Sequence, residues 1–216
     1  MVNNFSQTNS YINQIVFELR NIMIQKDRPR FRNNLEKFGM IIGYELSKGL
    51  YYSAEEVQTV LGSTVVETLD DRIVIISILR AGLPIQNGLL KLMDYAEVGF
   101  ISAYRREQPD GSFDIRMDYI TCPDLSGKVV IFTDPMLATG ASLDASMRMV
   151  ESYGTPKEVH VVSLIASEYA IEQVRRLYPS VRIWVGAVDE ELTAKSYIVP
   201  GLGDAGDLAY GEKLQG

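Results

Sequence analysis

A loop of small and hydroxyl-bearing residues follows one short apolar run and carries the clearest chemistry in the sequence. The run 129–133 leads into an acid and then a helical pattern, through Asp134, Pro135, Met136, Leu137, Ala138, Thr139, Gly140, Ala141 and Ser142. Small residues let a ligand approach the backbone, and the first amides of a helix are unpaired donors at its positive end. The Thr139 and Ser142 hydroxyls add donors, so the spacing predicts a phosphate cradle.

The acid at the start of this loop has a chemistry of its own. Asp134 is placed at the tip of the predicted strand, where its carboxylate could accept hydrogen bonds from sugar hydroxyls. The alternative is an ordinary Asp-Pro turn in which Ser142 serves only as a helix N-cap. The loop lacks Gly-Lys-Ser/Thr, which disfavours a nucleoside-triphosphate hydrolase.

Two arginines could bind an anion near such a loop. Arg80 follows the apolar run 73–79 and precedes a turn of small residues, where a guanidinium can meet phosphate oxygens bidentately. Arg105 lies in the stretch 104–107, ahead of a Pro-Asp-Gly turn, and local chemistry predicts a hairpin tip there. Taken alone, either arginine could be a solvated surface charge.

The segment 197–207 is rich in glycine and acid. It contains three glycines, one proline and two aspartates in eleven residues, and it has no periodicity. Such a composition is typical of a surface turn.

Together these motifs resemble the uracil phosphoribosyltransferases, within the type I phosphoribosyltransferases. Loop 134–142 is similar to their phosphoribosyl-pyrophosphate (PRPP) loop, with one acid followed by proline where the wider family has two adjacent acids. Ala141 stands where these enzymes normally have a second glycine. The segment 197–207 resembles their uracil-binding segment. The loops around Arg80 and Arg105 resemble those that bind and close over pyrophosphate.

The resemblance implies an activity in pyrimidine salvage: transfer of the 5-phosphoribosyl group from PRPP to uracil, giving uridine monophosphate (UMP) and pyrophosphate. It implies an oxocarbenium-like transition state with no covalent nucleophile. Mg²⁺ is the expected cofactor, held mainly by substrate oxygens and water rather than directly by protein side chains. The same resemblance implies a homo-oligomer, either a dimer or a tetramer, and allows for a purine-nucleotide effector.

The resemblance also assigns residues to these roles. The catalytic residues would be Arg80, Arg105 and Asp134. PRPP would contact Arg80, Arg105, all of loop 134–142, and Asp204. Uracil would be bound by Ile198, Gly203, Asp204 and Ala205, largely through backbone groups that match the alternating donors and acceptors of the base.

The elements that must position these residues alternate along the chain from residue 72 onward. Runs apolar on both faces are typical of buried parallel strands, and five occur, at 73–79, 98–104, 129–133, 159–165 and 181–188. Helical patterns lie between them, at 84–95, 142–153 and 169–178. This alternation predicts an α/β fold with a doubly wound, mainly parallel sheet, whose ligands bind at the carboxyl ends of the strands.

The first third of the sequence reads as helical. Helical spacing covers 11–26 and the stretch after Pro29, and Ser53 with Glu56 resembles a capping box opening a short helix toward Leu61. We therefore expect a single domain, 1–216, made of an N-terminal helical arm, 1–62, and an α/β core, 63–216. The base-binding hood would be the C-terminal segment 197–207.

Composition limits the other classes of function. No apolar stretch approaches the roughly 20 residues of a membrane span, and residues 1–7 lack the features of a secretory signal. The single cysteine, Cys122, can form no internal disulfide, which favours the reducing cytoplasm. A net charge of −7 argues against a general nucleic-acid-binding surface.

The remaining distinctive residues favour structural roles. His160 is the only histidine and lies in a strand pattern, so a zinc site is excluded and a packing role is predicted. Cys122 is expected to be an inert thiol. A solvated or subunit-contact patch, or alternatively an effector contact, is predicted for the basic run of Lys26, Arg28, Arg30 and Arg32.

Two other functions stay open at this stage. A regulator on the same fold could sense nucleotide or RNA, although the acidic charge and the uracil-like segment argue against it. A phosphoribosyltransferase for another base is the nearest alternative enzyme.

Overall fold

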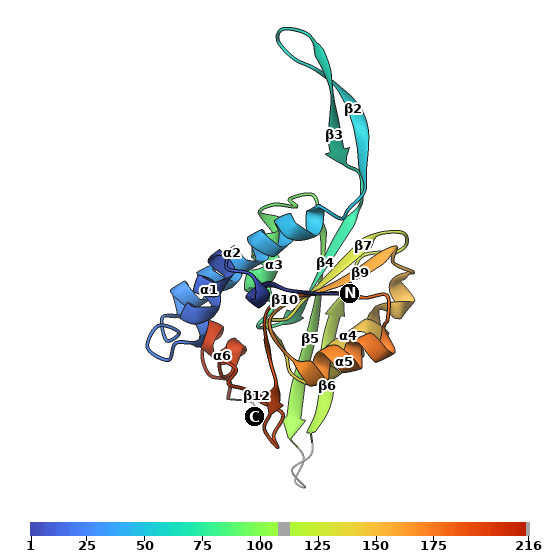
Figure 1. Ribbon diagram of the computed structural model, residues 1–216. Coiled ribbons are helices and arrows are strands. Elements are labelled where there is room, and N and C mark those ends of the chain that lie inside the picture. Colours follow the sequence, from blue (N-terminus) through green and yellow to red (C-terminus); the bar gives the residue numbers. More distant parts are fainter. Residues whose placement is uncertain (108–112, 215–216) are drawn as a thin grey trace.

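A large, mostly parallel sheet forms the centre of the protein (Figure 1). The computed structural model describes residues 1–107 and 113–214, with the backbone alone for 103–107 and 113–118. The eight strands are β1 (Val2–Asn4), β4 (Ile73–Leu79), β5 (Glu97–Glu107), β6 (Phe113–Thr121), β7 (Val129–Thr133), β8 (Met136–Leu137), β9 (Glu158–Ser167) and β10 (Arg182–Asp189). Their order is β1-β10-β9-β7-β4-β5-β6, with β8 beside β9, and only β5 and β6 pair antiparallel.

Helices cover both faces of this sheet, as Figure 1 shows. One face carries α1 (Tyr11–Arg20), α2 (Arg28–Ser47) and α3 (Leu83–Leu90), and the other carries α4 (Ala141–Val150) and α5 (Glu168–Leu177). Alternate residues of each central strand supply the two cores: Ile75 packs with the first set of helices, and Val74 and Ile76 with the second. The doubly wound, mainly parallel α/β fold predicted from the sequence is confirmed.

The sheet has its topological switch point between β4 and β7. β4 pairs with β5 on one side and with β7 on the other, and Ser77 lies opposite Thr133. Since α3 leaves β4 over one face and α4 follows β7 over the other, the carboxyl ends of these two strands mark the position at which doubly wound sheets have a crevice. Crevices of this kind bind ligands in doubly wound sheets.

A projecting hairpin corrects the predicted helix at residues 53–61. β2 (Tyr52–Gln58) pairs antiparallel with β3 (Ser63–Leu69), and the two extend away from the body of the protein (Figure 1). β-branched residues recur through this stretch and favour strands. The Thr59 hydroxyl closes the turn by accepting hydrogen bonds from the amides of Leu61 and Gly62. The helical part of the arm therefore ends at Ser47, and residue 62 lies in the turn of the hairpin.

Several short elements had no periodicity from which to predict them. β1 adds a parallel edge strand beside β10, and β6 adds an antiparallel edge beside β5. The C-terminal region contains β11 (Glu191–Leu192), β12 (Ile198–Val199) and α6 (Ala205–Tyr210), so the segment 197–207 is more regular than its composition indicated. Short 3₁₀ turns complete the elements at Phe5–Gln7 and Glu151–Tyr153. Within the part of the chain that is described, no helix is both long and apolar enough to cross a membrane.

Candidate functional site

The loop after β7 forms a compact hollow at the start of α4. Residues 136–143, together with Asp134, line a cavity of about 20 Å³. The Asp134 carboxylate accepts a hydrogen bond from the Met136 amide at 3.2 Å, and the Thr139 hydroxyl accepts one from the Ala141 amide at 3.3 Å. The Ser167 hydroxyl donates to the Ala138 carbonyl at 2.5 Å and ties the loop to the end of β9. The arrangement suits an anion at the positive end of α4.

Gly140 rather than Ala141 takes the special backbone conformation in this loop. Gly140 is the N-cap of α4 with φ 79°, in the left-handed region that glycine adopts without strain. Ala141 is the first helical residue, and Ser196 is the non-glycine residue at positive φ within the described part of the chain. The alternative that Ser142 is the N-cap is wrong, and Ala141 carries no left-handed strain.

The turn after β4 is locked against the end of β7. The Ser77 and Thr133 hydroxyls are 3.0 Å apart, and the Thr133 hydroxyl donates to the Gly82 carbonyl at 3.2 Å. A Cβ on Gly82 would lie 2.2 Å from the Thr133 carbonyl oxygen, so only glycine fits there. The Arg80 turn and the Asp134 loop are therefore held at adjacent strand ends.

Arg80 reaches across the crevice to the C-terminal segment. Its Nη2 donates to Asp207 Oδ1 at 3.0 Å and to the Gly211 carbonyl at 3.2 Å. The structure thus brings together two motifs that are 127 residues apart in the sequence.

The C-terminal segment lies against a pocket that the N-terminal arm helps to form. The pocket has a volume of about 450 Å³, and Gly203 and Asp204 share its lining with Lys26 and Arg28. That volume is in the range of small-molecule sites. Ile198 is buried in the core and Ala205 is buried at the start of α6. Of the predicted uracil residues, Gly203 and Asp204 line the pocket directly.

Asp204 has an electrostatic environment that keeps it ionised. Burial acts to raise its pKa, but hydrogen bonds from Lys213 and from the backbone outweigh burial, and the pKa lies below its ordinary value. Lys213 Nζ is 2.9 Å from Asp204 Oδ2, and Asp204 Oδ1 accepts from the Asp207 amide at 3.0 Å as the N-cap of α6.

An ion pair that the sequence reasoning missed anchors the same segment. Arg20 binds Asp189 with both terminal nitrogens, at 2.8 and 3.0 Å, and Asp189 Oδ2 also accepts from the Gly201 amide at 3.1 Å. Asp189 is only 6% exposed. The one signal in the sequence was an acid at the carboxyl end of the run 181–188, and nothing in the sequence pointed to Arg20.

The basic run 26–32 divides into two parts. Arg30 pairs with Glu18 at 2.9 Å, and this hydrogen bond is the main cause that lowers the pKa of Glu18 to about 2. Arg32 donates to the Ala209 carbonyl at 2.6 Å. Lys26 and Arg28 line the pocket. Arg30 is exposed despite its ion pair and Arg32 is partly buried, so the solvated or subunit-contact patch stays a prediction.

Arg105 is the predicted site residue about which the structure says least. Its backbone lies in β5 opposite Ile115, and its side chain lies outside the described residues. β5 continues through Glu107 and pairs antiparallel with β6, so Arg105 lies on a strand of this hairpin, whereas the predicted tip at residues 109–111 lies outside the described residues. No group of three or more His, Cys, Asp or Glu among the described residues could hold a metal ion.

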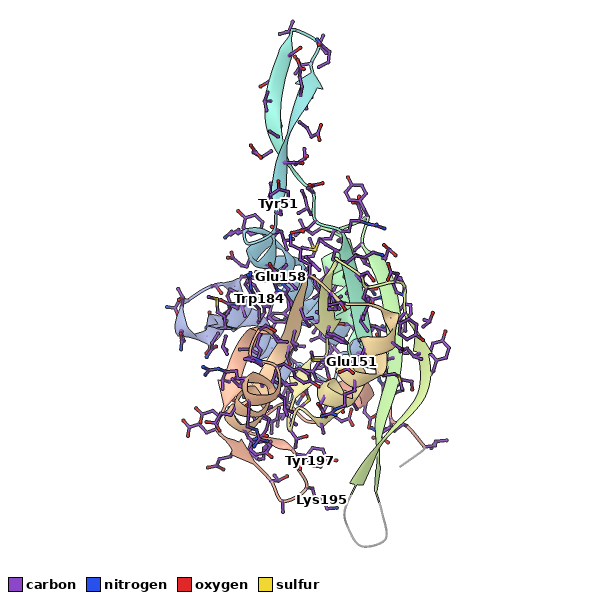
Figure 2. The ribbon with its side chains drawn as sticks, turned by 90° about the vertical axis from the view of Figure 1, so that its right-hand side faces the viewer. Tyr51, Glu151, Glu158, Trp184, Lys195 and Tyr197 are labelled. Carbon is purple, nitrogen blue, oxygen red and sulfur yellow. The ribbon has the colours of Figure 1, made fainter. Side chains whose placement is uncertain are left out.

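His160 and Cys122 lie away from the crevice. The buried His160 accepts a hydrogen bond from the Trp184 indole at 3.0 Å through Nδ1, and burial lowers its pKa to about 4. Figure 2 shows Trp184 and Glu158 well separated from Tyr197, the first residue of the C-terminal segment. Burial raises the pKa of the Cys122 thiol to about 11, which keeps it unreactive.

Comparisons with known proteins agree with this architecture. The profile of the family described as "Uracil phosphoribosyltransferase" matches residues 7–212. A uracil phosphoribosyltransferase of Porphyromonas gingivalis is 46% identical over 206 residues, which cover 95% of both chains. One from Pyrococcus furiosus is 41% identical over 208 residues, covering 95% of this chain and 88% of that protein.

A solved structure has nearly the same fold. The AQ2163 protein from Aquifex aeolicus superposes with a TM-score of 0.89 at 33% sequence identity, and the match covers 99% of this chain and 100% of that one.

Proposed function

We propose that this chain, which belongs to the uracil phosphoribosyltransferase family, transfers the 5-phosphoribosyl group of PRPP to uracil and releases UMP and pyrophosphate. The observation that carries this proposal is the crevice at the β4–β7 switch point. There the loop after β7 and the Arg80 turn follow adjacent strands, and Arg80 contacts Asp207 of the C-terminal segment.

Each side of the crevice would hold a different part of PRPP. The amides and hydroxyls of Thr139 to Ser142 would bind the 5′-phosphate, and Asp134 would accept hydrogen bonds from the ribose hydroxyls. Arg80 and Arg105 would bind the pyrophosphate, and Asp204 would assist in holding PRPP. Charge develops on pyrophosphate as it leaves an oxocarbenium-like ribose, so preorganised cations and positioning would supply the catalysis.

Mg²⁺ fits this site as an ion carried by the substrate. The described residues offer no cluster of acids or histidines that would hold the ion by itself. Mg²⁺ keeps several waters and is commonly bound through substrate phosphates, where it would neutralise charge on the pyrophosphate.

Backbone groups of the C-terminal segment would recognise uracil. Ile198, Gly203, Asp204 and Ala205 would present donors and acceptors that alternate as those of the base do. Two glycines support the required backbone path, since Gly201 has φ 54° and Gly203 has φ 98°.

The test of the activity is UMP formation from uracil, PRPP and Mg²⁺, with cytosine, hypoxanthine and orotate as parallel substrates. Turnover with uracil alone is the expected result. Turnover with another base would make the chain a different phosphoribosyltransferase. Failure with every base, together with UMP binding, would favour a regulator.

We further propose that the chain works as a homo-oligomer in the cytoplasm. The projecting hairpin supports an assembly, because Val60, Leu61 and Val65 are 101%, 98% and 65% exposed at its end and along one strand. The single cysteine supports a reducing compartment. Sedimentation of the chain and of a Val60→Ser/Leu61→Ser variant tests the assembly: the wild type should be a dimer or tetramer, and a monomeric wild type would contradict the proposal.

A purine-nucleotide effector would extend this proposal. Lys26 and Arg28 support it, because both are exposed and line the pocket beside Gly203. Steady-state rates with and without purine nucleoside triphosphates, in wild type and Lys26→Met, test whether these cations mediate activation.

A further inference from the structure

Asp207 is the second acid of the C-terminal segment, and its carboxylate is the ion-pair partner of Arg80. The Nη2–Oδ1 distance is 3.0 Å, and the two side chains are 42% and 27% exposed. The Gly211 carbonyl accepts from the same Nη2 at 3.2 Å. The Nη2 nitrogen of Arg80 is thus hydrogen-bonded by two groups of the C-terminal region, the Asp207 carboxylate and the Gly211 carbonyl.

The helix that carries Asp207 is held in place at both ends. It lies in the first turn of α6, whose Ala205 and Ala209 side chains are buried. Arg32 of α2 contacts the C-terminal end of α6 in two ways. It donates a 2.6 Å hydrogen bond to the Ala209 carbonyl, and its guanidinium lies 5.9 Å from the centroid of the Tyr210 ring. The carboxylate of Asp207 is therefore presented to Arg80 from a fixed direction.

Arg80 itself has a fixed base but a long side chain. Its turn is locked by the close packing of Gly82 against Thr133, whereas the side chain beyond the backbone is exposed to solvent. An unrestrained arginine loses rotamer freedom when it binds a ligand, and this loss lowers affinity. With Nη2 occupied, the Nε and Nη1 donors have no partner among the described residues and are available to pyrophosphate oxygens.

We infer that Asp207 is a positioning residue for Arg80, which it holds in the orientation that binds pyrophosphate. The inference rests on the proposed transfer reaction and adds a residue to it. Asp207 touches no reacting atom in this scheme and acts through the guanidinium.

The same contact couples the base-binding segment to pyrophosphate. Asp204 is the N-cap of α6, and its carboxylate accepts a hydrogen bond from the Asp207 amide at 3.0 Å. Gly206 lies close to both partners: a Cβ at this position would be 3.2 Å from Asp204 Oδ1 and 3.8 Å from Arg80 Nη2. Uracil bound at Gly203 to Ala205 would contact this turn, further stabilise the orientation in which Asp207 holds Arg80, and so raise the affinity for PRPP by some factor. By linkage, PRPP would raise the affinity for uracil by the same factor.

The central experiment compares Asp207→Asn with Asp207→Glu. The neutral, isosteric Asn loses a charge-assisted hydrogen bond, so the KM for PRPP should rise about three- to tenfold, a larger change than that in kcat. Glu keeps the charge and should recover most of the wild-type KM. Thermal unfolding of each variant shows whether α6 stays folded. An unchanged KM for PRPP in folded Asp207→Asn would overturn the inference.

Glu168→Gln is the matched control. Glu168 is an exposed acid in the first turn of α5, so like Asp207 it carries a negative charge in a first helical turn, but it does not contact Arg80. Its KM for PRPP should equal that of wild type. A rise as large as that in Asp207→Asn would mean that a first-turn charge alone explains the effect.

A double-mutant cycle tests whether Asp207 acts through Arg80. Lys213 Nζ also lies 3.9 Å from Asp207 Oδ1, although its closer partner is Asp204. PRPP binding measured by calorimetry in Arg80→Lys should be insensitive to Asp207→Asn, whereas additive losses would assign the role to another partner.

Failure of the inference is separable from failure of the transfer reaction. Wild-type enzyme that turns over uracil while Asp207→Asn keeps its KM removes only the positioning role. Wild-type enzyme that turns over no base removes the transfer reaction, and the calorimetric cycle then still reports whether Asp207 orients Arg80 toward an anion.

Discussion

The loop after β7 and the C-terminal segment are both linked to the carboxyl ends of β4 and β7, but by different means. The loop after β7 is held by neighbours in the sheet: β8 pairs with β9, and the Pro135 carbonyl accepts from the Ile165 amide. Within the described residues, the C-terminal region has the short β11–β12 pair and the six-residue helix α6 of its own. Its anchors are side chains from distant segments, Arg20 to Asp189 across 169 residues and Arg32 to Ala209 across 177.

This difference determines how each region should respond to mutation. Every residue except proline has both backbone hydrogen-bonding groups, so the loop geometry tolerates changes in its own side chains wherever no special φ is required. The C-terminal segment depends on individual charges, and removal of one partner leaves the other without its ion pair. The loop should therefore lose function only where a group contacts substrate, and the segment also where a distant anchor is removed.

The largest expected effect is at Arg80, where the two regions meet. Arg80→Ala removes a preorganised donor to the leaving pyrophosphate, and kcat/KM for PRPP should fall by about 10²- to 10³-fold. Steady-state kinetics with uracil in excess measures this change. Kinetics close to those of wild type would show that Arg80 does not bind pyrophosphate and that its contact with Asp207 has no part in catalysis.

Loss of the buried anchor should come next. Asp189→Ala leaves the Gly201 amide unpaired and leaves Arg20 without its carboxylate, with only the 3.4 Å hydrogen bond to the Gly201 carbonyl, and should lower the free energy of unfolding by about 3 to 4 kcal/mol. Denaturant unfolding measures the loss. Asp144→Ala is the control, since it breaks the more exposed Asp144–Arg148 pair and the Tyr178 contact on α4 and α5, and it should cost less. Equal costs would contradict the special dependence of the C-terminal segment on its anchor.

Acid should lower the free energy of unfolding through His160, which lies outside both the loop after β7 and the C-terminal segment. His160 has a folded-state pKa of about 4 against an ordinary 6.5, so the unfolded chain binds its proton at higher pH than the folded chain does. Its contribution is complete above pH 6.5 and is lost as the pH falls toward 4, by at most about 3 kcal/mol.

Because His160 is the only histidine, its titration can be isolated. Stability of wild type and His160→Gln between pH 7 and pH 4.5 should differ in slope, with the variant nearly flat. Parallel slopes would assign the acid sensitivity to carboxylates instead, among which Glu18, with a pKa of about 2, responds only at lower pH.

The smallest effect is expected within the phosphate loop. Ala141→Gly should leave the affinity for PRPP within about twofold, and lower stability by about 0.5 kcal/mol, because a helical φ gives glycine no advantage. Calorimetric titration with PRPP measures the affinity. A large gain in affinity would mean that the loop changes its backbone when substrate binds.

The sequence by itself determined the parts whose information is local. The five apolar core runs, the loop 134–142 and the turn at Arg80 were all predicted, because a buried strand and the small residues that follow it are written in consecutive positions. The strand at Ile73–Leu79 and that at Val129–Thr133 have the bounds that the pattern predicted.

Only the tertiary structure decided which distant groups meet. A capping-box pattern at Ser53 was overridden by β-branched residues that pair as a hairpin, because local propensities compete and the total pairing decides. Arg20 with Asp189, and Arg80 with Asp207, leave no trace in the sequence, since an ion pair imposes no spacing along the chain. The loop after β7 was thus predictable from consecutive residues, whereas the anchoring of the C-terminal segment required the folded chain to bring its partners together.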